Sequence, residues 1–106
     1  MLLAETLPEF AQELQRLLQA QKPELAVQVP ILKIVEGCGC GDGFCASFYT
    51  QPKPNGAYGH GHDTLLLDTE APGMLILDVV DGVISFIEVL YRPDVRQKLV
   101  ALGLQL

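Results

Sequence analysis

Residues 74–91 read MLILDVVDGVISFIEVLY, which is two apolar runs joined by Asp81-Gly82. An Asp-Gly pair between such runs is the strongest short-range sign of a β-hairpin, because a type I′ turn needs positive φ at both central residues. The stretch therefore predicts an antiparallel hairpin with strands over 74–80 and 83–91. Both faces of this ribbon are largely apolar, so we expect it to be central, with a helix over one face and another part of the chain over the other.

A two-residue turn also determines which residues face one another across the hairpin. Counted outward from the turn, the expected pairs are Val80 with Val83, Val79 with Ile84, Asp78 with Ser85, Leu77 with Phe86, Ile76 with Ile87 and Leu75 with Glu88. Asp78 and Ser85 would then form a hydrogen-bonded polar couple within the ribbon.

Capping residues, prolines and hydrophobic periodicity predict the remaining elements. Thr6 and Glu9 have the spacing of a capping box, at the start of a helix over about residues 7–20. Pro93 opens a last helix, and Gly103 ends it. Further strands are expected over 25–36, where Pro30 interrupts the run, and over 44–50 and 64–68, with a turn at 37–43 and a long loop at 51–63.

These elements predict one α+β domain over residues 1–106. It contains an antiparallel, meander-like sheet of about five strands, with an N-terminal and a C-terminal helix. The hydrophobic fraction of 49% is high for 106 residues, so either the core takes a large share of the chain or some apolar surface meets a protein partner, for which a homodimer is one expectation.

Charge and hydropathy exclude two classes of partner. The formal net charge is −6 and the 7 basic residues are scattered, so nucleic acid is not an expected partner. No apolar run approaches the roughly 18 residues that a membrane span needs. The beginning, MLLAETLPEF, lacks the basic region of a signal peptide, so we expect a cytoplasmic protein with reduced thiols.

All the cysteines and histidines of the chain lie in one segment: Cys38, Cys40 and Cys45 in GCGCGDGFC, then His60 and His62 in YGHGHD. Cys38 and Cys40 are two apart on one expected strand and point the same way, and Cys45 begins the returning strand. Three thiolates can therefore converge at a hairpin tip, and His60 or His62 can complete a tetrahedral site for zinc. Soft thiolates also suit copper(I) and iron.

Three other interpretations of these cysteines remain open, because C-x-C-x4-C followed by H-x-H matches no standard zinc pattern. The cysteines can be small apolar residues packed in a tight turn. Cys38 and Cys40 can oxidise reversibly, with Cys45 as the resolving thiol. Cys45 can also serve as a nucleophile with a loop histidine as its base.

The motif ILD-x-x-x-G-x-I-x-x-I-E-V-L in the segment 64–95 resembles small uncharacterised bacterial β-meander domains. The matching positions are Ile76, Leu77, Asp78, Gly82, Ile84, Ile87, Glu88, Val89 and Leu90. Such domains commonly lack an assigned activity. The resemblance implies a small bacterial protein. We predict a cytoplasmic binding or interaction domain rather than an enzyme, with a Cys/His metal site at the hairpin tip.

Two other function classes remain alongside this prediction. An acidic interaction module, similar to immunity or antitoxin-type partners, would bind no metal and would expose an apolar patch on the hairpin. A small metal- or thiol-dependent enzyme would hold the cysteines in a concave pocket with an open coordination position.

Overall fold

The computed structural model describes all 106 residues and confirms the predicted α+β architecture. One antiparallel sheet has the strand order β1-β2-β5-β4-β3. The strands are β1 (Glu36–Gly37), β2 (Phe48–Tyr49), β3 (His62–Leu67), β4 (Met74–Val80) and β5 (Val83–Leu90). The helices are α1 (Leu3–Thr6), α2 (Pro8–Gln21), α3 (Pro23–Ala26), the 3-10 helix η1 (Val29–Ile31) and α4 (Pro93–Ala101).

The predicted central hairpin is confirmed as β4 and β5. Asp81 and Gly82 join the two strands with φ of 50° and 80°, both positive as a type I′ turn requires. Beyond the turn, Val80 pairs with Val83 and Val79 with Ile84, as the sequence predicts.

The predicted pairing is wrong beyond Val79, because the register shifts between Asp78 and Val79. Asp78 faces Phe86, so Ser85 is the extra residue of a β-bulge. All pairs further out are displaced by one residue; among them Leu77 faces Ile87, Ile76 faces Glu88 and Leu75 faces Val89.

The bulge has a clear physical reason in the burial of β5. Strict alternation would place Ile84 and Ile87 on opposite faces of the strand. With Ser85 inserted, Ile84 and Ile87 are both fully buried, and so is Val89 two residues further on. The apolar side chains of β5 thus share the core face, and Phe86 turns outward.

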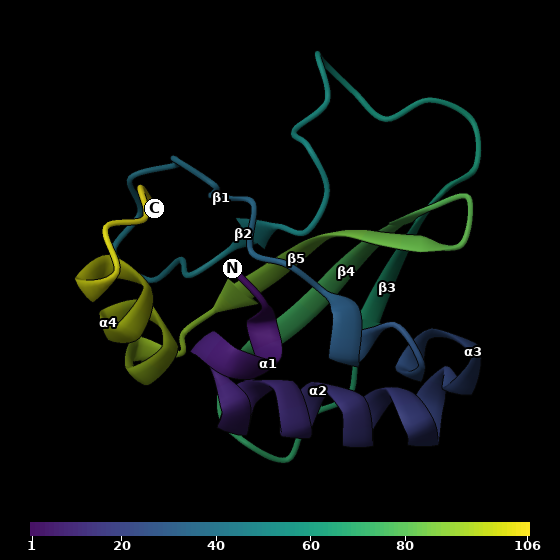
Figure 1. Ribbon diagram of the computed structural model, residues 1–106, viewed down its shortest axis with the longest axis horizontal. Coiled ribbons are helices and arrows are strands. Elements are labelled where there is room, and N and C mark those ends of the chain that lie inside the picture. The colour runs from purple at the N-terminus through teal and green to yellow at the C-terminus, as the bar shows by residue number, and fades with distance from the viewer.

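Helix α2 covers the core face of the sheet (Figure 1), as the prediction of an N-terminal helix implies. Its buried residues Phe10, Leu14 and Leu18 belong to one hydrophobic cluster with the inward side chains of β4 and β5. Phe10 packs edge-on against Phe48 of β2, with ring centroids 6.3 Å apart. Burial of apolar area in this layer supplies the main driving force for the fold.

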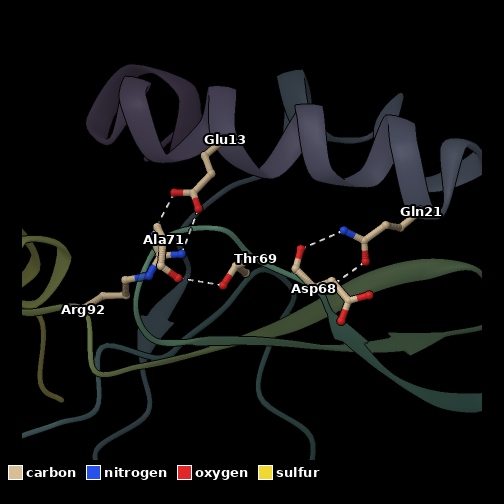
Figure 2. A network of polar contacts seen from close by, with 6 residues as sticks. All are labelled: Glu13, Gln21, Asp68, Thr69, Ala71 and Arg92. Carbon is tan, nitrogen blue, oxygen red and sulfur yellow. Dashed lines mark hydrogen bonds and ion pairs between the residues drawn. The ribbon is translucent and has the colours of Figure 1, made fainter.

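Polar contacts hold the end of the edge strand β3 to α2 (Figure 2). The side chain of Gln21 donates a hydrogen bond to the Asp68 carbonyl at 2.8 Å and accepts one from the Asp68 N–H at 2.9 Å. An amide side chain thus takes the place of a neighbouring strand, so these backbone groups at the sheet edge are paired.

The opposite face of the sheet, here called the outer face, carries no helix. Its residues on β4 alternate with the buried ones and are half-buried or exposed. Phe86 contacts Tyr49 there, with ring centroids 4.4 Å apart, and Tyr58 of the loop between β2 and β3 contacts His62 at 4.8 Å. The second face is therefore only partly covered, by aromatic side chains.

The prediction of a strand over 25–36 is wrong. This segment forms α3 and η1, and only its last residue, Glu36, belongs to a strand. Pro23 and Pro30 stand in the first turns of these short helices, where the fixed φ of proline suits a helix and its missing N–H is not needed. A short apolar run does not distinguish a buried helical turn from a strand.

Candidate metal centre

The loop that carries the cysteines connects β1 to β2. Glu36 pairs with Tyr49 and Gly37 with Phe48, which confirms a hairpin here, although its strands are far shorter than predicted. The pairing continues irregularly beyond β1, since the N–H of Cys38 donates to the carbonyl of Ser47 at 3.0 Å. Residues 38–45, the cysteine loop, therefore close on themselves at one end of the sheet.

Two interactions place Cys45 at the base of this loop. Its N–H donates to the carbonyl of Asp42 at 3.1 Å, which closes a tight turn. Cys45 also forms an isolated bridge with Leu90 at the end of β5. The predicted strand over 44–50 is thus reduced to this bridge and the two residues of β2.

The three sulfur atoms lie together. The Sγ of Cys38 is 3.2 Å from the Sγ of Cys40 and 3.2 Å from the Sγ of Cys45, and all three lie within 4.8 Å of one another. A zinc ion with Zn–S bonds of about 2.3 Å at tetrahedral angles would hold its sulfurs about 3.8 Å apart. The distances in the cluster bracket this value, so one ion fits between the three sulfurs with small side-chain adjustments.

The three cysteines differ in burial. Cys45 is 5% exposed, Cys38 is half-buried and Cys40 is exposed. An ion between them would lie at the boundary of the protein, with Cys45 beneath it and Cys40 toward solvent.

Ser47 fixes the buried sulfur. Its hydroxyl lies 3.2 Å from the Sγ of Cys45 and accepts a hydrogen bond from the N–H of Val89 in β5 at 2.9 Å. Sequence reasoning missed Ser47, although a residue two positions from Cys45 is expected on the same face of an extended segment.

The electrostatics of the cluster shift the pKa values of Cys38 and Cys45 in opposite directions. Burial raises the pKa of Cys38 to about 12, and the neighbouring sulfurs of Cys45 and Cys40 raise it further. A hydrogen bond with the N–H of Cys40 acts in the opposite direction and lowers this pKa. Burial also acts to raise the pKa of Cys45, but hydrogen bonds with Ser47, Cys38 and Cys40 outweigh it and lower that pKa below its ordinary value. Cys45 therefore ionises before Cys38, and its hydrogen bonds with these neighbours stabilise a thiolate that can bind a cation.

The predicted histidine ligands lie elsewhere. The cluster of ligand atoms contains the three cysteines and no histidine or carboxylate. His62 belongs to β3, at the opposite edge of the sheet from β1, where its Nε2 lies 2.8 Å from the Oδ1 of Asp78. His60 is exposed in the loop that precedes β3. The structure thus brings Cys38, Cys40 and Cys45 together but leaves both histidines out.

A second group of polar side chains lies around Asp78 on the outer face. The Oδ1 of Asp78 accepts hydrogen bonds from Thr64 at 3.2 Å and from His62, when its Nε2 is protonated. The hydroxyl of Tyr58 is buried nearby without a hydrogen-bond partner. Burial raises the pKa of Tyr58, and the charge of Asp78 adds to this effect.

No family model, curated protein or solved structure matches this chain. None of its helices combines the length and the hydropathy that crossing a bilayer requires.

Proposed function

We propose that this protein is a small metal-binding domain in which Cys38, Cys40 and Cys45 hold one thiophilic ion, zinc in the first place. The observation that supports this most directly is the convergence of three sulfurs from one short loop within 4.8 Å. Thiolates are preferred ligands of zinc and of copper(I), and zinc also accepts three protein ligands plus one from outside.

The alternative role of the cysteines as packing residues explains only part of this arrangement. A free cysteine behaves as a small apolar residue and is usually buried, which describes Cys45. Cys40 is exposed, and yet its sulfur lies 3.2 Å from that of Cys38. Metal binding accounts for the position of all three sulfurs.

The proposed site requires reduced thiols, which supports the predicted cytoplasmic location. Sulfurs 3.2 Å apart, as in Cys38 and Cys45, are also close enough to be oxidised to a disulfide, whose S–S bond is about 2.05 Å. The metal content must therefore be measured on protein that is purified under reducing conditions without chelator.

Metal content by mass spectrometry tests the proposal. We expect about one zinc ion per chain in the unmodified protein and in His62→Ala, and strong depletion in Cys38→Ser and Cys40→Ser. Cys40 is exposed, so the Cys40→Ser variant keeps the packing of the core. Metal below about a tenth of an equivalent in all four proteins, with the native circular dichroism retained, would refute a metal-binding function.

The outer face supports the second predicted function, binding of a protein partner. Leu66 and Met74 are 57% and 39% exposed there. Apolar side chains gathered on one face are typical of an interaction surface. Sedimentation analysis of the purified protein tests whether a second copy is that partner; a strict monomer at all concentrations would argue for a different protein.

A further inference from the structure

We propose that the three-cysteine site keeps a fourth coordination position that this chain does not fill, and that a thiolate from outside the chain occupies it. This inference rests on the proposed function, since it concerns the ion that Cys38, Cys40 and Cys45 would bind. It names the class of ligand that the loaded site recognises.

The side chains at the cluster supply three donors and no fourth. No histidine, aspartate or glutamate has a ligand atom within the cluster. The hydroxyl of Ser47 is the one other side-chain group that contacts a sulfur, and it already accepts the N–H of Val89. Thiolate, imidazole and carboxylate are the protein ligands of zinc, so a neutral hydroxyl in this position does not complete the site.

The free position faces away from the protein. Cys45 closes the inner side of the cluster, where Ala46 and Ser47 are also buried. On the outer side, a Cβ atom built on Gly39, Gly41 or Gly43 would meet nothing within 4 Å. The segment after α4 borders the loop, where the carbonyls of Gln105 and Leu106 accept hydrogen bonds from the N–H groups of Gly39 and Gly41 at 3.1 Å. Cys40 is exposed beside this segment, so a molecule from solvent can approach the ion on the side of Cys40.

A cavity of about 400 Å³ next to the cysteine loop offers room for such a ligand. Cys38 and Gly39 line it from the loop, and Gln105 lines it from the segment after α4. Lys53 and Glu36 also line this cavity, so their charges balance and the attraction for an anionic ligand comes from the metal ion itself.

A sulfur donor fits this position. Four cysteines, and three cysteines with one histidine, are both standard closed donor sets of zinc, and a fourth sulfur completes the all-thiolate set that the chain leaves at three. The thiolate can come from a small free thiol or from a cysteine of a second copy. In both cases the thiol S–H loses its proton to solvent and the sulfur donates a lone pair to the ion, without oxidation or reduction.

Cobalt(II) replaces zinc as a coloured probe in the test, and N-acetylcysteine is the external thiol. We expect one cobalt per chain with sulfur-to-metal absorption, and visible bands that shift and saturate at one thiol per metal. At ten times its own dissociation constant, the thiol should lower the apparent dissociation constant of cobalt about tenfold. Bands that shift with protein concentration alone, together with a dimer, would also support the proposal and assign the thiolate to a second copy.

Two variants control for a hidden ligand from the chain. Asp42→Asn removes the carboxylate within the cysteine loop and His62→Ala removes the histidine of β3, and both should show the same shift as the unmodified protein. Bound cobalt whose bands and affinity do not respond to the thiol or to protein concentration would overturn the open position and leave metal binding intact. Absence of sulfur-to-cobalt absorption would instead refute the metal site itself.

Discussion

The guanidinium group of Arg92 forms a two-point ion pair with Glu13, with N–O distances of 2.9 and 2.8 Å (Figure 2). The pair connects the middle of α2 to the residue before α4, 79 positions away in the chain. Glu13 raises the pKa of Arg92, mainly through these hydrogen bonds. The Arg92 side chain is 8% exposed, so its charge depends on this carboxylate rather than on water.

Removing the carboxylate should therefore destabilise the protein. We expect Glu13→Gln to lower the free energy of unfolding by about 2 kcal/mol, because it removes the charge of the carboxylate that is hydrogen-bonded to a buried guanidinium. Urea denaturation measures this. The matched control is Glu24→Gln, which removes the exposed pair of Glu24 with Lys22 and should change the stability by less than about 0.5 kcal/mol. Equal losses in the two variants would show that burial of the pair has no effect.

Zinc affinity should fall with decreasing pH, because binding must displace protons. The pKa of Cys38 is about 12, so at neutral pH this thiol is protonated and zinc must release that proton. For each proton displaced, the apparent dissociation constant should rise about tenfold per pH unit on acidification. Competition with a chromophoric chelator between pH 7 and pH 9 measures the slope. An affinity that does not change over this range would contradict the assignment of Cys38 as a ligand.

Ser47 should matter more for stability than its size suggests. Ser47→Ala leaves the buried N–H of Val89 without an acceptor and should cost about 1–3 kcal/mol. It also removes a hydrogen bond that lowers the pKa of Cys45, so zinc binding should weaken. Thermal denaturation and a zinc titration provide the two measurements. Ser85→Ala is the control: its hydroxyl donates only to the Val83 carbonyl, so stability should change less and zinc affinity not at all.

The loop next to the cysteines has little tolerance for a larger residue at Gly37. A Cβ at this position would collide with the carbonyl oxygen of Gln105, which accepts a hydrogen bond from the N–H of Gly39 at 3.1 Å. Gly37→Ala should therefore displace the segment after α4 and lower the stability by about 1–3 kcal/mol. Gly43→Ala places its methyl group in open space and should stay within about 0.5 kcal/mol of the unmodified protein. Similar denaturation midpoints for the two variants would contradict the close approach.

The parts of the fold that the sequence predicted correctly are those with strong local signals. Asp81-Gly82 determines the turn between β4 and β5, and Pro93 marks the start of α4. The bulge at Ser85 has no such signal, because it results from the common burial of Ile84 and Ile87 in the hydrophobic cluster. Tertiary packing decided the register there, as it does wherever one face of a strand is buried.

For the candidate site as well, the sequence predicted only what local spacing determines. The three cysteines lie in one loop, so local spacing sufficed to predict that their sulfurs converge. The histidines follow after a long loop, and their spacing did not reveal that the loop leads to the far edge of the sheet. Where His62 lies depends on the pairing of β3 with β4, a contact that no short motif encodes.

The hydrophobic cluster of 22 buried residues contains none of the three cysteines. Classical zinc fingers, by contrast, remain unfolded until the metal binds, because the ion substitutes for a core. In this protein the core is complete without the ion, and the sulfurs lie on a loop at its margin. Under the proposed function, we therefore expect loading and folding to be separable events, with an ion that enters and leaves a domain that stays folded throughout.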